Sequence, residues 1–141
     1  MMEEKKLMLS PIGEEEARLR NPLVLAYIGD TIYDLYVRTY FVKNTKLGVN
    51  ALNSRCAGMV NARVQAGAAR RIYDSLNERE QDIFRRGRNS SPKSTAKNMS
   101  VADYMSATAL ESVIGYLYLS GEHERIEELM ETIIGFGEED E

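Results

Sequence analysis

The sequence contains only one cysteine, Cys56, and only one histidine, His123, among its 141 residues. A single cysteine excludes an internal disulfide and any zinc site built from three or four cysteines. Cys56 is expected to be a small packing residue, and His123 lies between two glutamates in a polar stretch. The sequence also has no glycine-rich phosphate loop. Covalent catalysis with a histidine base and phosphate binding by such a loop therefore have little support.

Long apolar runs are missing as well. The opening segment MMEEKKLMLS lacks the apolar run of a signal peptide, and no later stretch could span a bilayer. With no export signal and no disulfide, we expect a cytoplasmic protein that has no membrane partner. The length, with 43% hydrophobic and 28% charged residues, fits one globular domain. We expect residues 1–141 to form a single catalytic domain, with frayed tails at 1–10 and 136–141.

Strand signals are scarce, because no stretch sustains the alternation of apolar and polar residues that a half-buried strand shows. The apolar spacing instead predicts an all-α fold. The clearest helix begins at Asn21-Pro22, an N-cap followed by proline at the first helical position, and fades near residues 43–44. Four apolar residues at helical spacing form its predicted core stripe: Leu25, Ile28, Ile32 and Leu35.

Further helices follow along the chain. One is expected over residues 47–57, with Gly58 as a break, and another around the apolar positions between 60 and 72. Asn77 and Glu80 resemble a capping box that opens a short helix, which Gly87 would end.

The segment from residue 87 to residue 100 is polar and basic, and it contains a proline, so it predicts a mobile loop. Ser100 with Asp103 would cap the next helix, which Gly121 would stop. A last amphipathic helix covers the apolar positions between 126 and 133.

The net charge of −4 hides an uneven distribution. From Arg38 to Lys97 the chain carries thirteen basic and four acidic residues, a local charge of +9, while the remainder sums to −13. A basic middle between acidic ends favours a polyanionic partner that meets one face, although scattered solvated charge would also explain it.

Two carboxylates stand in the two most apolar helices. Asp30 lies in LAYIGDTIYDLY, and Glu111 lies in ATALESVIGYLYLSG. A charge buried there needs a partner, either an arginine or backbone amide, or a metal ion shared by both acids. Mg²⁺, with Mn²⁺ as a substitute, suits oxygen ligands of this kind. Asp34, one turn after Asp30, lies near the same side and could join the cluster.

Small residues accompany both acids. Ala26 precedes Asp30 by one turn, and Thr108, Ser112 and Gly115 lie on the same side as Glu111. Such neighbours leave room beside a carboxylate for water, a cation or a second backbone.

Three segments together resemble the ribonuclease III family. IGDTIYDLY is similar to its signature helix, MVNARVQAGAARRI to its Leu-Val-x-x-x-x-Leu-Ala helix, and TALESVIGYLYLSG to its second acidic motif. The resemblance covers Asn21 to Gly121. The short length, and RRGRN ahead of a basic loop, are closer to the mini-ribonuclease III branch, which lacks a double-stranded-RNA-binding domain.

The resemblance implies an all-helical, homodimeric endonuclease domain that hydrolyses double-stranded RNA with Mg²⁺. Its products would carry 5′-phosphate and 3′-hydroxyl ends, and its target would be precursor 23S ribosomal RNA. Asp30 matches the signature aspartate, Glu111 the metal-binding glutamate, and Asp34 an acid that ends the signature helix. The chain departs from the family at Ala26 and Thr108, where the family carries two more acids.

Without an accessory domain, RNA binding must come from the helical domain and its dimer partner. Contacts with A-form RNA go mainly to phosphates and 2′-hydroxyls. The basic residues expected to make them are Arg70, Arg71, Arg85, Arg86, Arg88, Lys93 and Lys97. Because two family acids are missing, two alternatives stay open: a dimeric protein that binds double-stranded RNA without cutting it, and a plain helical interaction protein.

Overall fold

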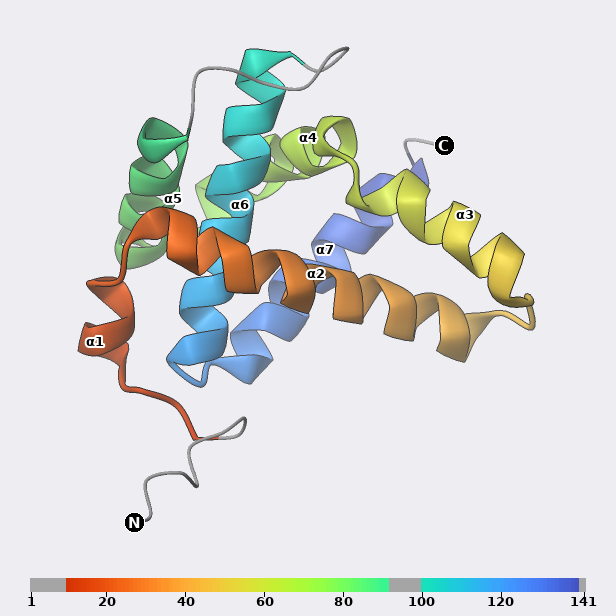
Figure 1. Ribbon diagram of the computed structural model, residues 1–141, viewed down its shortest axis with the longest axis horizontal. Coiled ribbons are helices and arrows are strands. Elements are labelled where there is room, and N and C mark those ends of the chain that lie inside the picture. Colours follow the sequence, from red (N-terminus) through yellow and green to blue (C-terminus); the bar gives the residue numbers. More distant parts are fainter. Residues whose placement is uncertain (1–9, 92–99, 140–141) are drawn as a thin grey trace.

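The computed structural model describes residues 10–91 and 100–139, and within these ranges all regular secondary structure is helical (Figure 1). The predicted all-α class is therefore confirmed. In chain order the elements are α1 (Glu14–Arg18), α2 (Pro22–Asn44), α3 (Val49–Val60), α4 (Ala62–Ile72), the short 3₁₀ helix η2 (Tyr73–Ser75), α5 (Glu78–Ser90), α6 (Val101–Leu119) and α7 (His123–Glu139). No helix in the described part of the chain has both the length and the apolar character that a bilayer crossing demands.

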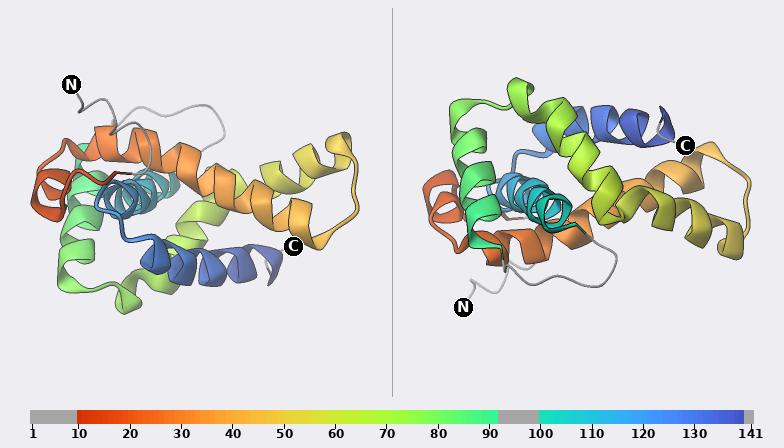
Figure 2. Two further views of the ribbon diagram at one scale, coloured as in Figure 1. Left: turned by 90° about the horizontal axis from the view of Figure 1, so that it is seen from below. Right: turned by 90° about the horizontal axis from the view of Figure 1, so that it is seen from above.

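Helix α6 is the centre of the fold. Every residue from Ala107 to Leu117 is buried except Glu111, which is partly exposed. Helices α2, α4, α5 and α7 pack around α6, which Figure 2 shows nearly end-on. The single carboxylate of this stretch therefore lies at its one position that opens toward solvent.

Helices α2 and α6 cross with their backbones in close contact. A Cβ atom added to Gly29 would overlap the carbonyl oxygen of Glu111, and one added to Gly115 would overlap the carbonyl oxygen of Leu25. The hydroxyl of Ser112 also donates a hydrogen bond across this crossing to the carbonyl oxygen of Pro22, at 2.9 Å. The small residues noted in both helices thus make room for another backbone.

The predicted helix starts are confirmed. The side chain of Asn21 accepts a hydrogen bond from the Leu23 amide at 2.8 Å, and the Ser100 hydroxyl accepts one from the Asp103 amide at 2.9 Å. Asn77 and Glu80 form both hydrogen bonds of a capping box.

Two predicted helix breaks are wrong. Gly58 lies inside α3, which continues to Val60, and a Cβ atom added at Gly58 would meet no other atom within 4 Å. Gly87 lies inside α5, which runs on to Ser90. A Cβ atom at Gly87 would come within 2.9 Å of the Cβ of Ser112, so this glycine serves close packing of α5 on α6 rather than helix termination.

The ends of two predicted features also differ from the structure. Residues 136–139, expected in a frayed tail, belong to α7, whose Gly137 is buried in close approach to Met59. Leu35, assigned to the core stripe of α2, is 57% exposed, whereas Leu25 is fully buried. The core-facing side of α2 instead continues through Tyr33 and Val37.

Candidate active site

Asp30 and Glu111 meet at the α2–α6 crossing. Because Gly29 touches the backbone of Glu111, the next residue on α2 is placed beside that side chain. The two carboxyl groups lie close enough for Asp30 to raise the pKa of Glu111. Asp30 is exposed, and Glu111 is partly buried, so the pair lies at the edge of the core and open to solvent on the Asp30 side.

Burial, together with the neighbouring Asp30, raises the pKa of Glu111 to about 8. Burial is the main cause, and the hydrogen bond and negative charge of Asp30 add to it, while a hydrogen bond from Gln65 acts in the opposite direction. Ionisation of Glu111 is therefore disfavoured near neutral pH unless a positive charge compensates it.

The part of the chain that the structure describes offers no arginine partner that would make these acids purely structural. Within the described residues neither carboxylate forms an ion pair with a lysine or an arginine. Glu111 lies beside Asp30 and accepts a hydrogen bond from Gln65, whose Nε2 donates to Oε2 of Glu111 at 3.2 Å. A pair of carboxylates without a cation is the arrangement that a divalent metal ion would complete.

Tyr33, one turn after Asp30 on α2, adds a second sign of an incomplete polar site. The residue is 1% exposed, and its hydroxyl has no hydrogen-bond partner in the described part of the chain. Burial and the nearby charge of Glu111 both raise the pKa of this hydroxyl. A buried polar group normally has a partner, so Tyr33 is suited to bind a water molecule held beside the carboxylates.

These donors fit a hard divalent cation. Carboxylate and hydroxyl oxygens are the groups that Mg²⁺ prefers, and a site with only two protein carboxylates leaves positions for water and substrate phosphate. Groups of three or more His, Cys, Asp or Glu side chains able to hold a metal do not occur within residues 10–91 and 100–139. Any ion here would therefore depend on Asp30 and Glu111 together.

Asp34 does not join this pair. Its Oδ2 accepts a hydrogen bond from Nε of Arg38 at 2.9 Å, on the exposed side of α2. The prediction that Asp34 shares in the acidic cluster is therefore not supported, because Asp34 lies one turn further along α2 and pairs with Arg38.

The basic residues proposed for RNA binding separate into different environments. Arg70 and Arg88 line one hollow of about 280 Å³ between α4, α5 and α6, together with the Tyr73 and Phe84 rings. Arg85 donates a hydrogen bond to the Tyr73 hydroxyl at 3.2 Å, beside this hollow. These three arginines form one basic surface, which we call the α4–α5 arginine cluster. Within the cluster, Arg70 lies 4.0 Å from an oxygen of Asp103 and Arg85 lies 3.9 Å from an oxygen of Asp82, both at exposed positions.

Two of the other arginines have closer structural partners. Arg71 pairs with Glu139 at 3.3 Å and lies over the ring of Phe136, so it joins α4 to α7. Arg86 donates to the carbonyl oxygens of Arg18 and Arg20, at 2.9 and 3.3 Å, and so holds the segment between α1 and α2. Lys93 and Lys97 lie outside the described residues.

Gln65 and Tyr33 are site residues that the sequence did not single out. Gln65 has one visible signal, because it is the only polar uncharged residue of α4 and lies among small apolar residues. Which helix it would face could not be read from the sequence.

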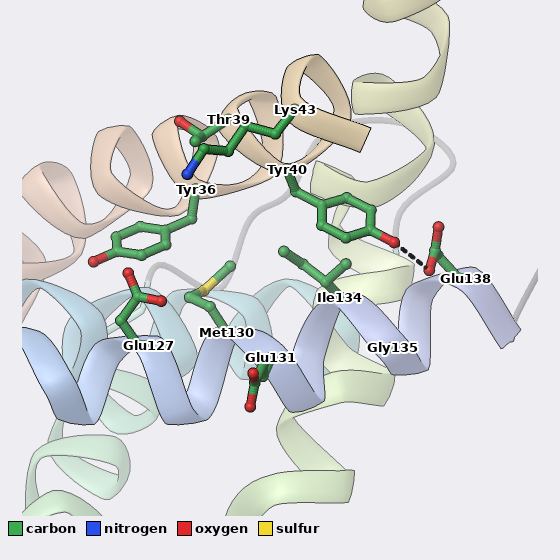
Figure 3. A pocket seen from close by; sticks show the side chains of 10 residues that line it. All are labelled: Tyr36, Thr39, Tyr40, Lys43, Glu127, Met130, Glu131, Ile134, Gly135 and Glu138. Atoms are coloured by element: carbon green, nitrogen blue, oxygen red, sulfur yellow. Dashed lines mark hydrogen bonds between the residues drawn. The ribbon is translucent and has the colours of Figure 1, made fainter. Parts of the chain in front are cut away.

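A separate hollow of about 310 Å³ lies between α2 and α7 (Figure 3). Met130 and Ile134 point into it from α7, opposite Tyr36 and Tyr40 of α2. The Tyr40 hydroxyl closes one end with a hydrogen bond to Glu138 at 2.9 Å. Its lining includes no residue of the carboxylate pair or of the α4–α5 arginine cluster.

Comparison with known proteins decides the family. The model of the ribonuclease III domain matches residues 23–122, which contain both carboxylates, Gln65 and the α2–α6 crossing. The chain belongs to the ribonuclease III family. A mini-ribonuclease 3 of Clostridium tetani is 46% identical over 133 residues, covering 91% of this chain and 88% of the relative. A mini-ribonuclease 3 of Staphylococcus aureus is 40% identical, covering 86% and 92%.

A solved structure agrees with this assignment. The crystal structure of a protein from Fusobacterium nucleatum superposes with a TM-score of 0.76 at 30% sequence identity, and it covers 84% of this chain and 94% of that protein. The family membership and these relatives identify the chain as an endoribonuclease with the ribonuclease III fold, in the mini-ribonuclease III branch.

Proposed function

We propose that this ribonuclease III family member hydrolyses double-stranded RNA with Mg²⁺ at a site formed by Asp30 and Glu111. The observation that carries the proposal is the meeting of these two carboxylates at the α2–α6 crossing with no arginine or lysine bound to either in the described residues. An acidic pair without a cation is unfavourable for folding and is explained by a function that uses it.

Asp30 and Glu111 would hold the metal ion, with Mn²⁺ as a substitute for Mg²⁺. When bound, such an ion lowers the pKa of a coordinated water and stabilises the charge that develops on a phosphodiester. Asp30, on the exposed side, would face the RNA, while Glu111 anchors the site to α6. Ala26 and Thr108 leave space where the family carries acids, so water would fill more of the ion's coordination positions.

Binding of the RNA backbone would come from the α4–α5 arginine cluster. Arg70 and Arg88 are exposed at the rim of one hollow. Exposed guanidinium groups bind phosphates without reading base sequence, which suits an A-form duplex. The positive charge of the central segment supports the same assignment.

A homodimer is supported by an apolar strip on the outer side of α2. Four large apolar side chains at helical spacing are exposed there: Leu23 at 37%, Val24 at 51%, Tyr27 at 81% and Leu35 at 57%. Contiguous exposed apolar side chains on a soluble protein often mark an interface. In a dimer formed through this strip each copy would supply one carboxylate pair, and each pair would cut one strand of the duplex.

We further propose that the substrate is a precursor of 23S ribosomal RNA and that the products carry 5′-phosphate and 3′-hydroxyl ends, in the cytoplasm. This part of the proposal rests on the family resemblance. The alternative, a dimeric protein that binds duplex RNA without cutting it, is favoured by Ala26 and Thr108 in place of acids.

The two candidates are separated by incubating the purified protein with long duplex RNA, with and without Mg²⁺. We expect cleavage only with Mg²⁺, no cleavage by Asp30→Asn, and retained RNA binding by that variant. Asp34→Asn is the matched control, because it removes a carboxylate one turn away that is paired with Arg38, and it should cut normally. Binding without cleavage by the wild-type protein would favour the alternative.

A further inference from the structure

Gln65 is the one side chain from α4 that is hydrogen-bonded to the carboxylate pair in the described residues. It is 3% exposed, and its Nε2 donates to Oε2 of Glu111 at 3.2 Å. Asn61 caps the start of α4, which packs against both α6 and α7. Its small residues Ala66, Gly67, Ala68 and Ala69 are all buried. The packing of α4 on α6 therefore fixes where the Gln65 amide lies.

Burial of this amide is not explained by packing alone. A primary amide taken out of water costs free energy unless it is hydrogen-bonded. In the family pattern Leu-Val-x-x-x-x-Leu-Ala, which MVNARVQA resembles, Gln65 stands at the second leucine. An apolar side chain would thus suit the position, and the polar one is accounted for by its bond to Glu111.

We propose that Gln65 is a positioning residue that holds the Glu111 carboxylate for the metal ion. The inference rests on the proposed function and deepens it. By fixing Oε2 from the α4 side, the amide restricts rotation of the carboxyl group and directs its other oxygen toward the space shared with Asp30.

The neutrality of the amide is the main reason for this role. An arginine or lysine at position 65 would also orient Glu111, but its charge would neutralise the carboxylate and compete with a divalent ion. The amide donates a hydrogen bond and adds no charge, so the full negative charge of the pair remains for the cation. The same logic applies to groups that orient metal ligands in other proteins, where their removal lowers metal affinity by roughly 10–100-fold.

This role also compensates for the acids that the chain lacks. With Ala26 and Thr108 in place of carboxylates, the ion has only two protein carboxylates to hold it. When a site has few ligands, free rotation of one of them lowers its metal affinity more than it would in a site with many ligands. Gln65 therefore raises metal affinity by ordering an existing ligand instead of adding a further charge.

The test measures Mn²⁺ and Mg²⁺ binding to the full-length protein by isothermal titration calorimetry, with no RNA present. Gln65→Leu removes the donor and restores the side chain of the family pattern. Gln65→Met is the second variant, because its unbranched side chain of similar length fits if leucine disturbs α4. We expect both variants to bind Mn²⁺ about 10–100-fold more weakly than the wild type.

Ile72→Val is the matched control. It removes one methylene group from a residue of α4 that is 1% exposed and is not part of the site. It should lower stability without changing the Mn²⁺ dissociation constant. At saturating Mg²⁺ the Gln65 variants should cleave as fast as the wild type. They should need a higher Mg²⁺ concentration to reach half of that rate.

The outcomes separate this inference from the proposed function. If the wild type binds Mn²⁺ through Asp30 but both Gln65 variants bind equally well, Gln65 is a packing residue and the inference is overturned. If the wild type binds no Mn²⁺ and cuts no duplex RNA, the proposed function fails and the role of Gln65 fails with it. A tenfold loss also seen in Ile72→Val would assign the effect to general loosening of α4 and would overturn the inference.

Discussion

Gly29 on α2 and Glu111 on α6 lie in backbone contact, so that any side chain at position 29 would overlap the Glu111 carbonyl oxygen. A second glycine, Gly115, makes the same kind of contact with Leu25 one turn along the crossing. This close crossing brings Asp30 to Glu111, and a wider one would separate the two carboxylates. The geometry of the site therefore depends on glycines that carry no chemistry themselves.

Gly29→Ala is expected to lower the free energy of unfolding by about 3 kcal/mol, because a methyl group cannot be placed without moving one of the two helices. Gly58→Ala is the matched control, since Gly58 is also inside a helix but has open space around it. Alanine there should raise stability by about 0.5–1 kcal/mol. Urea unfolding of both variants checks this pair, and equal effects would contradict the close crossing.

Stability of the metal-free protein should fall as the pH rises from about 4.5 to about 8. Glu111 has a folded-state pKa raised from 4.5 to about 8, so across this window the folded protein binds more protons than the unfolded chain. Below pH 4.5 Glu111 is protonated in both the folded and the unfolded protein, so its ionisation does not affect stability. Above pH 8 it is ionised in both, and the buried charge lowers the free energy of unfolding in full.

Glu111→Gln should remove this dependence. At pH 9 without metal the variant is expected to be more stable than the wild type by about 1–3 kcal/mol, and at pH 4 the two should be alike. Unfolding in urea at a series of pH values, with a chelator present, measures the difference. A wild-type stability that rises from pH 5 to pH 8 more steeply than that of the variant would contradict the raised pKa.

Arg88 and Arg86 are neighbours with different expected roles. Arg88 is exposed, and its side chain makes no hydrogen bond or ion pair within the described residues, whereas Arg86 holds two carbonyl groups near α1. Arg88→Gln should weaken duplex binding and reduce the slope of log affinity against log salt by about 1. Arg86→Gln should instead lower stability by about 1–2 kcal/mol.

Fluorescence anisotropy with a labelled RNA duplex at several salt concentrations, combined with urea unfolding, distinguishes the two variants. A loss of RNA affinity in Arg86→Gln that exceeds the loss in Arg88→Gln would contradict the α4–α5 arginine cluster as the binding surface.

Glu80 and Arg125 form an ion pair in which the carboxylate is buried and the arginine is partly exposed. Glu80 is 2% exposed, and both of its oxygens accept hydrogen bonds from Arg125 at 2.9 Å. Arg125→Met should lower stability by about 3 kcal/mol, because it leaves a buried carboxylate unpaired. Arg20→Met breaks the exposed pair with Glu16 and should change stability by less than about 0.5 kcal/mol. Urea unfolding measures both variants, and similar losses of stability in the two would contradict the larger contribution of the Glu80–Arg125 pair.

The parts of the structure that local chemistry determines were predictable from the sequence. Asn21, Asn77 and Ser100 cap the helices that they were expected to cap, because an N-cap hydrogen bond involves residues only two or three positions apart. The meeting of Asp30 and Glu111 was inferred from a family resemblance, and the small residues beside them pointed to a close approach of some kind.

The remaining features depend on contacts between distant segments. Gly58 and Gly87 are equivalent as local helix-breaking signals, yet one lies in open space and the other packs against Ser112. Arg86 and Arg88 are two residues apart in a basic segment, yet only Arg86 meets the carbonyl groups before α2. Gln65 reaches Glu111 because α4 packs against α6. Local sequence cannot distinguish such cases because the partner is far away along the chain.

The central claim is that Asp30 and Glu111 hold one divalent ion between them. The most direct test is a crystal grown with Mn²⁺, examined at a wavelength where manganese scatters anomalously. We predict one anomalous peak about 2.0–2.2 Å from an oxygen of each carboxylate, lost in Asp30→Asn crystals. A peak bound elsewhere, or two carboxylates that point apart with each paired to its own arginine, would contradict the claim.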